Sequence, residues 1–440
     1  MEMFLGVGLV VDTLGDGDSF RFVLPMNNIM IDKKYPPKAL AACLGLAGLT
    51  GITQAQELFG AYSDYQQYSG SELLQDALLL SEDFGTLKAG VRGGVKYDNN
   101  IFLSDSGKES DVIFNTELIL GLESKKGVQD RWALTYIGGY KFYADNSQFN
   151  GLDNNLFGSY SKTFSKTQVD LSASVTDISG SDRFVSAHTD KLLTAFNLDV
   201  SRVLTGKTRL DVDLGFRGLD YDNDDVYFDR NTYNTRVALQ YQWTGKTTVG
   251  PYVGYEYVDL SGGSNEEALS AGVSFSYQVF AKTALTGSIG GESRSFSGNA
   301  ISDRSSFVWD LGASHNYSAK TKIDAHLYGK AQPSVSRGGA AYESTGVSLD
   351  VNHATSSRLN LRARFGYEHD DYFIVNDNDP LVLGSDITDN DYYFVSVGGQ
   401  YRAAYGVLVG ADASWRTQNS DDGNDDFDGF TLQLSATYYF

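Results

Sequence analysis

Long segments of strictly alternating apolar and polar residues constrain the fold of this chain more than any other feature. In residues 430–440 every second side chain is apolar: Phe430, Leu432, Leu434, Ala436, Tyr438 and Phe440. Residues 167–177, 209–217 and 358–370 repeat the pattern. Because successive side chains of a β-strand point to opposite faces, each segment has one apolar and one polar face. Alternation alone is compatible with a soluble β-sandwich and with a membrane-spanning barrel.

Three further features favour the barrel. The alternating segments are about 10–13 residues long, close to the ~9–11 that a tilted strand needs to cross a bilayer and above the ~5–6 of a typical globular strand. Aromatic residues such as Trp132, Trp243 and Trp415 stand near the ends of the apolar faces, as in an interfacial girdle. Short turns and long loops also alternate along the chain.

The short turns carry a repeated signature. Ser, Gly or Ala is followed by Lys and Thr at Lys166, Lys207, Lys246, Lys282 and Lys320, which are 36 to 41 residues apart. A fixed spacing of this kind indicates one repeated unit of two strands and a long loop, as in an up-and-down meander. Gly-Lys-Thr also ends the phosphate-binding loop, but Ser201 and Gln240 stand where that loop requires its first glycine.

Eighteen strands are predicted, near residues 87–97, 111–124, 128–144, 154–164, 167–177, 191–204, 207–219, 231–243, 247–259, 267–280, 283–294, 306–318, 321–331, 342–352, 358–370, 391–401, 406–417 and 428–440. Sixteen stays open because boundaries read from a sequence are uncertain by ~2–4 residues. We therefore expect residues 87–440 to form an all-β, transmembrane, antiparallel up-and-down β-barrel. Short periplasmic turns and nine long extracellular loops are expected to connect the strands, since short inner turns and long outer loops are typical of bacterial outer-membrane barrels.

Residues 1–55 are expected to be an upstream extension and a cleaved signal peptide. Lys33, Lys34 and Lys38 precede an apolar stretch at 39–52, and residues 53–55 fit a cleavage site before Gln56. Residues 1–29 have no evident role, so translation is expected to start at Met26 or Met30.

The only cysteine, Cys43, lies in that apolar stretch, where an ordinary leader residue is favoured over a lipoprotein box. Residues 56–86 are expected to be a periplasmic segment or a plug. Within them, residues 71–80 are predicted either as a short helix capped by Ser71 or as part of a disordered tail.

The polar faces carry many charges of both signs. A Lys or Arg facing lipid at the bilayer midplane costs about 2–4 kcal/mol, so these residues are predicted to line the lumen. They are Lys88, Arg92, Glu117, Lys141, Asp170, Asp199, Arg209, Asp211, Asp213, Arg217, Arg236, Glu256, Asp310, Lys322, Asp324, Lys330, Arg362, Arg364, Glu368, Asp412 and Arg416. A barrel of 16–18 strands is too wide for side chains to fill, which favours an aqueous passage. The alternative is a lumen closed by inward loops and ion pairs.

The charge balance excludes some partners. With 35 basic and 56 acidic residues the chain has a net charge of −21, which argues against nucleic-acid binding. Acidic loops at 220–229, 370–379 and 421–426 are predicted to be solvated, and Ca²⁺ bridging to surface glycans is the alternative. The five histidines form no evident Ser–His–carboxylate grouping. No metal, cofactor or enzymatic activity is therefore predicted.

Residues 97–104 (Tyr-Asp-Asn-Asn-Ile-Phe-Leu-Ser), the Glu-Ser-Asp at 109–111, the Lys-Thr turns and Phe440 resemble the putative β-barrel porin type 2 family over about residues 86–440. The resemblance implies an outer-membrane barrel. Phe440 is similar to the final aromatic residue that the barrel assembly machinery recognises. Members of the family are often associated with exopolysaccharide export, which implies a glycan channel and polysaccharide export components as candidate partners. The family has no catalytic residues to carry over.

The expected protein is thus an integral barrel in the outer membrane of a Gram-negative bacterium, in contact with lipid and lipopolysaccharide. Its expected function is a porin-like channel for polar solutes or for exopolysaccharide export. A structural or adhesive surface barrel with acidic loops is the alternative, and a barrel hydrolase is the third. Tyr252, Tyr328 and Tyr439 on the polar faces offer ring surfaces for a sliding sugar.

Overall fold

A computed structural model describes residues 10–13, 20–23, 78–81, 85–124, 130–184, 187–222, 227–261, 264–297, 302–334, 341–373, 389–404, 406–421 and 426–440. Residues Met1–Gly45 and Leu46–Phe440 are separate units. In the first unit, β1 (Val10–Thr13) and β2 (Phe20–Val23) pair as an antiparallel two-stranded sheet. The predicted leader at 30–55 lies outside the described residues.

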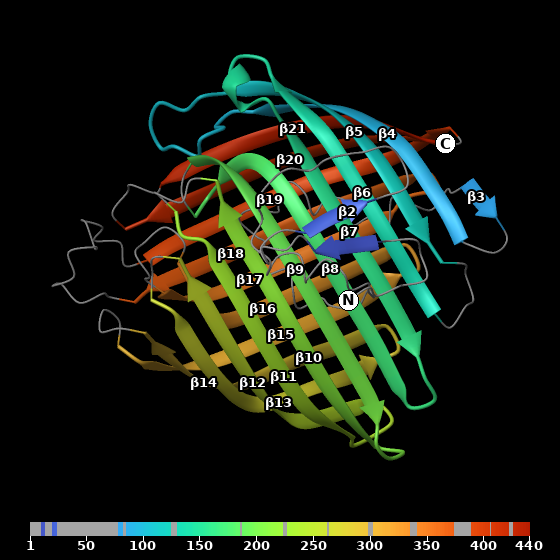
Figure 1. The fold of residues 1–440 in the computed structure, drawn as a ribbon, viewed down its shortest axis with the longest axis vertical. Coiled ribbons are helices and arrows are strands. Elements are labelled where there is room, and N and C mark those ends of the chain that lie inside the picture. Colours follow the sequence, from blue (N-terminus) through green and yellow to red (C-terminus); the bar gives the residue numbers. More distant parts are fainter. Residues whose placement is uncertain are drawn as a thin grey trace. The chain divides into compact units, whose positions relative to one another are not determined.

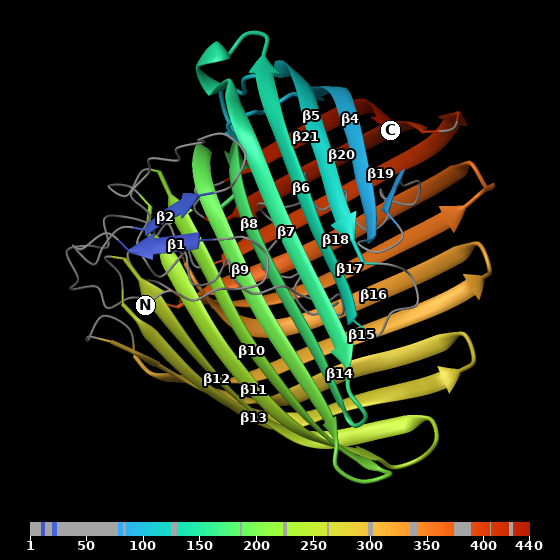
Figure 2. The same ribbon diagram turned by 45° about the vertical axis from the view of Figure 1, so that its right-hand side comes forward.

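The second unit is a closed barrel of eighteen antiparallel strands, which confirms the predicted fold and strand number (Figure 1 and Figure 2). Each strand pairs with the next along the chain, and β21 pairs with β4 to close the ring. The strands are β4 (Gly85–Asp98), β5 (Asp111–Glu123), β6 (Asp130–Tyr143), β7 (Gly151–Thr163), β8 (Thr167–Asp182), β9 (Ala187–Val203), β10 (Thr208–Tyr221), β11 (Arg230–Gln242), β12 (Thr247–Leu260), β13 (Glu266–Phe280), β14 (Thr283–Phe296), β15 (Arg304–Ser318), β16 (Thr321–Pro333), β17 (Ala341–Ala354), β18 (Leu359–Tyr372), β19 (Asp389–Ala404), β20 (Val407–Ser420) and β21 (Phe427–Tyr439).

The repeated short turns contain a local hydrogen bond from a backbone N–H to a side-chain hydroxyl. In three of the five turns, the hydroxyl two residues before the lysine accepts a hydrogen bond from the lysine N–H, at 3.2 Å for Thr205, 3.1 Å for Thr244 and 3.1 Å for Ser318. Phe164 and Phe280 stand at that position in the other two turns. Ser356 does the same for the N–H of Arg358 at 3.2 Å, in the turn whose sequence departs most from the signature. These are ST turns, in which a side-chain oxygen satisfies a backbone donor at a tight reversal. The repeated sequence is therefore explained by the requirements of tight turns.

Several strands extend further toward the long loops than predicted. β8 continues from the expected residue 177 to Asp182, and β9 begins at Ala187 in place of residue 191. In residues 179–182, Ser-Gly-Ser-Asp, both faces are small or polar, so the alternation that marks a lipid-facing strand is lost while the backbone pairing continues. The alternation of apolar and polar residues marks only the part of a strand that faces lipid, and the strands extend beyond that part.

The segment before the barrel differs from the prediction. Residues 78–80, the end of the predicted helix, lie in strand β3 (Leu78–Ser81), while residues 71–77 lie outside the described part. β3 pairs with the start of β4 at Leu87 and Thr86. This stretch of the β4 edge lies beyond Gly90, where the pairing with β21 ends. An unpaired strand edge favours the addition of a strand, which explains why residues 78–81 form β3 and not the end of a helix.

The outward face of the wall is apolar and exposed, whereas the inward face is polar. In β21 the outward Leu434 is 51% exposed and the neighbouring inward Ser435 is 8% exposed. Exposed apolar side chains form a contiguous surface around the barrel, which in a folded protein marks contact with lipid or another apolar partner. In the described part of the chain, no helix has both the length and the apolar character needed to span a bilayer.

Candidate functional site

The strand register brings all twenty-one charged residues of the predicted lumen onto one face of the sheet. Asp170 lies opposite Asp199, which lies opposite Asp213, which in turn lies opposite Arg236. This face is opposite to the exposed apolar side chains. Which of these residues contact a passing solute stays a prediction.

Many of these charges are paired along the wall. Arg92 pairs with Glu117, and Arg362 and Arg364 share Asp350, each with a nitrogen 2.9 Å from a carboxylate oxygen. Other pairs join Lys88 to Glu123 at 3.0 Å, Lys141 to Asp153 at 2.6 Å and Lys322 to Asp324 at 2.9 Å. Glu123, Asp153 and Asp350 were not among the predicted residues, although each stands at an inward position of its strand.

The end of the β8–β9 hairpin reaches across the interior. Arg183 follows β8, yet its guanidinium pairs with Glu368 on β18 and lies 4.0 Å from an oxygen of Asp370. The guanidinium carbon also stacks 4.3 Å from the ring centroid of Tyr392 on β19. The O–H of Tyr328 on β16 donates to the second oxygen of Glu368. We call these five buried residues the Arg183 cluster.

A second set of contacts fixes the same hairpin from its own side. Lys191 Nζ lies 2.7 Å from Asp182 Oδ2, and the Tyr221 O–H donates to that oxygen at 2.9 Å. All three residues are at most 2% exposed. By contrast, Arg209 near the short turns has a side chain that is 50% exposed. These three side chains are therefore shielded from solvent at the long-loop end of β8 to β10.

The segment of residues 99–104, here the Asn100 loop, also folds inward. Asn100 Nδ2 donates to the carbonyls of Ser104 at 2.8 Å and Asp428 at 2.9 Å, and Asn100 Oδ1 accepts from the Ser104 N–H at 3.0 Å. Leu103 packs in a buried cluster of inward side chains that also contains Tyr392, Phe394 and Phe427.

The Asn100 loop is tied to the β8–β9 hairpin and held in an unusual backbone conformation. The Ser181 hydroxyl donates to the Ile101 carbonyl at 2.6 Å, which connects the loop to the end of the hairpin. Leu103 has φ 53°, a backbone conformation that is uncommon outside glycine and that persists where the surroundings impose it.

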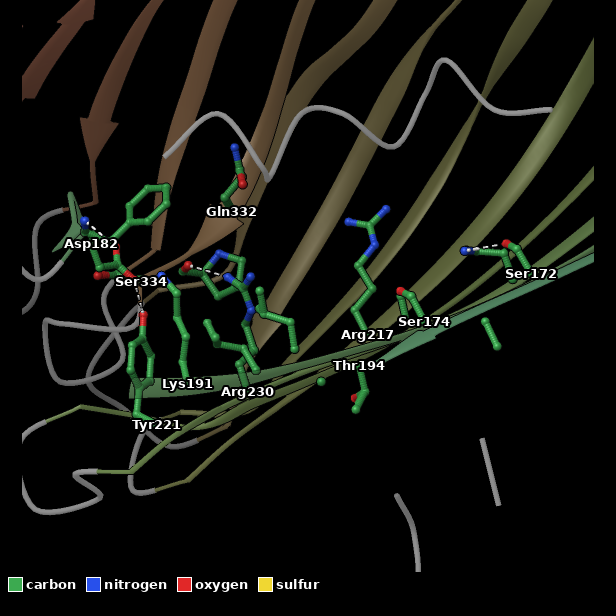
Figure 3. A pocket seen from close by; sticks show the side chains of 18 of the residues that line it. Ser172, Ser174, Asp182, Lys191, Thr194, Arg217, Tyr221, Arg230, Gln332 and Ser334 are labelled. Atoms are coloured by element: carbon green, nitrogen blue, oxygen red, sulfur yellow. Dashed lines mark hydrogen bonds and ion pairs between the residues drawn. The ribbon is translucent and has the colours of Figure 1, made fainter. Parts of the chain in front are cut away.

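Among the cavities formed by the described residues, two small ones lie within the barrel, and Lys191 lines both. The larger, about 230 Å³, is bounded by β7 to β11 on one side and by the end of β16 and Tyr342 on the other (Figure 3). The smaller, about 110 Å³, is lined by Arg92, Lys96, Asp98 and Lys141 together with Ser181. The Arg183 cluster and the Asn100 loop thus narrow the interior toward the long-loop end.

The structure brings Ser179 close to His188, a contact that must be considered as a possible catalytic pair for hydrolysis. Ser179 Oγ lies 2.9 Å from His188 Nε2, an arrangement that the sequence did not indicate. In the described part of the chain, His188 Nδ1 is buried with no hydrogen-bond partner, so no carboxylate orients the ring as a triad requires. His188 instead stacks on Phe149 with ring centroids 4.1 Å apart. Within the same described residues, no group of three or more His, Cys, Asp or Glu could hold a metal ion.

The fold and the interior together define the class of the protein. A closed, even-numbered antiparallel barrel with an exposed apolar exterior and a charged interior is a porin-like β-barrel of the outer-membrane type. The family described as putative beta-barrel porin 2 matches residues 84–440, and the chain belongs to that family. Both point to a channel rather than to an enzyme.

Proteins of two bacteria are among the solved structures of similar fold. The outer membrane protein OpdK of Pseudomonas aeruginosa is 12% identical with a TM-score of 0.43, over 80% of this chain and 99% of that one. OccK2 (OpdF) of the same species is 13% identical with a TM-score of 0.42, over 80% and 98%. The FrpB iron transporter of Neisseria meningitidis is 9% identical with a TM-score of 0.42, over 80% and 82%. No curated protein sequence matches this chain significantly.

Proposed function

We propose that the protein is an outer-membrane channel that passes small polar solutes. The observation that carries the proposal is the charged inward face of a closed barrel whose outward face is apolar. Eighteen strands enclose more space than side chains fill, so the interior holds water. The charged side chains that face inward are stable in contact with this water. Membership in the putative beta-barrel porin 2 family supports the same function.

The narrowing of the interior supports a limit on solute size. The Arg183 cluster crosses from β8 to β18, and the described cavities beside the hairpin measure about 230 Å³ and 110 Å³. Ligand sites for drug-sized molecules measure ~300–1,000 Å³, so these cavities fit smaller solutes. An extended polysaccharide would require the hairpin end to move aside. Tyr252, Tyr328 and Tyr439 stand on separate strands, β12, β16 and β21, which does not support a continuous track for sugars.

Conductance tests the proposal directly. We expect the purified, folded full chain to give discrete conductance steps in planar lipid bilayers. In liposome swelling assays, monosaccharides should enter faster than trisaccharides, and longer oligosaccharides should be excluded. A silent bilayer with folded protein would contradict the channel and favour a structural or adhesive barrel. Equal entry of long oligosaccharides would contradict the size limit and favour polysaccharide export.

We further propose that Phe440 is the signal read by the barrel assembly machinery. Phe440 is 51% exposed and its N–H donates to the Ala89 carbonyl at 2.9 Å, at the seam between β21 and β4. An exposed terminal ring is accessible before the seam closes. Phe440→Ala should lower the amount of folded protein in the outer membrane of cells while leaving refolding of the purified chain into detergent unchanged. An equal loss in both assays would indicate a structural role only.

A further inference from the structure

Five short turns with the repeated lysine give one end of the barrel a basic edge. Because neighbouring strands are antiparallel, the turns that follow β7, β9, β11, β13 and β15 all lie at the same end (Figure 2). Their lysines are all exposed, and we call them the lysine arc: Lys166, Lys207, Lys246, Lys282 and Lys320. Although the whole chain has a net charge of −21, these turns contain no Asp or Glu.

The hydrogen bonds of these turns involve the backbone of the lysine and not its side chain. Where a hydroxyl is present, it accepts from the lysine N–H, a group that every residue except proline has. The turns with Phe164 and Phe280 at the hydroxyl position also carry a lysine. The ammonium groups are therefore available for another role.

The strand register places the lysine arc on the inward side of the wall. The N–H of Gln242 donates to the carbonyl of Lys207 at 2.8 Å, and each of the other four lysines accepts a bond of 2.8–2.9 Å from its own neighbouring strand. Lys207 stands two residues before Arg209, and Lys320 two residues before Lys322, both on the inward face. Since alternate residues of a strand share a face, the arc borders the mouth of the barrel.

In the part of the chain that the structure describes, no carboxylate forms an ion pair with the lysine arc. Lys320 Nζ donates to the Thr355 carbonyl at 3.3 Å, which is a neutral acceptor. Deeper along the same strands the basic residues do have acidic partners: Arg209 lies 2.8 Å from an oxygen of Asp211, and Lys322 lies 2.9 Å from an oxygen of Asp324. The unbalanced positive charge of these strands therefore lies at the edge.

Neighbouring lysines of the arc are close enough for their electric fields to add. Two strand spacings of ~4.8 Å separate them, or ~10 Å, which is about the Debye length at 0.1 M salt. A potential of one sign at the mouth of a low-dielectric wall raises the local concentration of ions of the opposite sign. Rings of basic side chains in pores favour anions for this reason.

We propose that the lysine arc attracts anionic solutes to the short-turn mouth of the barrel and gives the channel a preference for anions. The proposal rests on the proposed function and deepens it by naming the charge of the preferred solutes. An acidic row deeper in the wall opposes the arc: Asp170, Asp199 and Asp213, with Arg236 opposite Asp213. A solute that enters by the short-turn mouth meets the lysines first.

Ion selectivity in planar bilayers tests the preference. Under a KCl gradient, the reversal potential of the full, folded protein should show that chloride permeates more readily than potassium. Replacing all five lysines of the arc with Gln should abolish or reverse this preference. Arg202→Gln serves as the control, because Arg202 is an exposed basic residue near the same edge that lies opposite Leu210 on the outward face. This variant should leave the reversal potential unchanged.

A second measurement reads the potential at the mouth in detergent, without any current. Gln242→Cys, in a Cys43→Ser background that removes the only native cysteine, places a thiol opposite Lys207. A negatively charged methanethiosulfonate should modify this thiol faster, relative to a positively charged one, than it does after Lys207→Gln and Lys246→Gln. A fall of ~0.5 kT in the local potential lowers that rate ratio about threefold. Arg202→Gln should leave the ratio unchanged, and 1 M salt should remove the difference, because the Debye length is then ~3 Å.

The outcomes separate the lysine arc from the channel itself. Conductance with a preference for potassium, or with a selectivity that stays the same without the five lysines, would overturn the role of the arc and leave the channel intact. A rate ratio that does not respond to Lys207→Gln and Lys246→Gln would also overturn it. A silent bilayer combined with a rate ratio that depends on these lysines would contradict the channel and support the attraction of anions to this end of the barrel.

Discussion

Arg183 and Glu368 form an ion pair across the interior of the barrel, although β8 and β18 stand on nearly opposite sides of its wall. Both side chains are at most 4% exposed. Removing charges from water costs several kcal/mol per ion, so such a pair persists only where further contacts satisfy both partners. Asp370, Tyr392 and Tyr328 provide them. The pair therefore holds the hairpin end in the position that narrows the channel.

The first prediction follows from that pair. Arg183→Ala should raise the single-channel conductance, because the hairpin end loses its attachment to β18 and the interior widens. It should also lower the stability of the folded barrel by about 3–5 kcal/mol, the usual cost of leaving a buried partner uncompensated. Conductance in planar bilayers and urea unfolding in micelles measure the two effects. Arg358→Ala, in an exposed short turn, serves as the control and should change neither. Unchanged conductance in Arg183→Ala would show that the cluster does not limit the path.

The second prediction concerns the Asn100 loop. Asn100→Ala removes two donated hydrogen bonds and one accepted bond, so the loop should leave the interior more often. We expect noisier current traces and faster cleavage of the loop by added protease. Asn100→Asp keeps the acceptor for the Ser104 N–H and loses the donors, so its effect should be intermediate. Identical protease resistance in all three proteins would place the stabilisation of the loop elsewhere.

The sequence predicted the wall of the barrel far better than its interior contacts. All eighteen strands were predicted correctly because every second residue of each strand faces lipid and is therefore apolar. The Lys-Thr signature also marked the short turns between strands. The closure of the barrel brings Arg183 and Glu368 together although they lie 185 residues apart in sequence. No local sequence pattern predicts a contact of this kind. Leu103 was recognised within a family motif, but its packing against Phe394 and Phe427 follows from a loop that folds inward. Buried polar ends such as Asp182 and Lys191 lie where the alternation has already ended.

The third prediction concerns pH and Asp111, which begins β5 at the long-loop end. Burial favours its neutral form, but hydrogen bonds from the side chain and N–H of Asn146 and the N–H of Asp145 stabilise the carboxylate, and the pKa of Asp111 is held below its usual value. A lowered folded-state pKa contributes stability that is present above the unfolded pKa of ~3.9 and is lost as the pH falls below it.

The test of this contribution compares two proteins at two pH values. The stability difference between wild type and Asp111→Asn should be largest at pH 7 and should shrink at pH 3, measured by unfolding in urea. Asp145→Asn removes a neighbouring exposed carboxylate of the same loop and serves as the control, with little effect at either pH. A difference that does not change with pH would exclude the charge of Asp111 as the stabilising factor.

The fourth prediction tests which face of the wall contacts lipid, using two adjacent residues of β21. Leu434 points outward and is 51% exposed, whereas Gln433 lies opposite Asp412 on the inward face. Leu434→Lys should destabilise the barrel in lipid by about 2–4 kcal/mol, the cost of a lysine near the bilayer midplane. Gln433→Lys introduces the same side chain one residue away, next to an acidic neighbour, and should be tolerated. Folding into lipid vesicles, followed by heat-modifiable migration in gels, measures both. Equal folding of the two variants would contradict a lipid-facing surface, because water on both sides of the sheet would treat the two lysines alike.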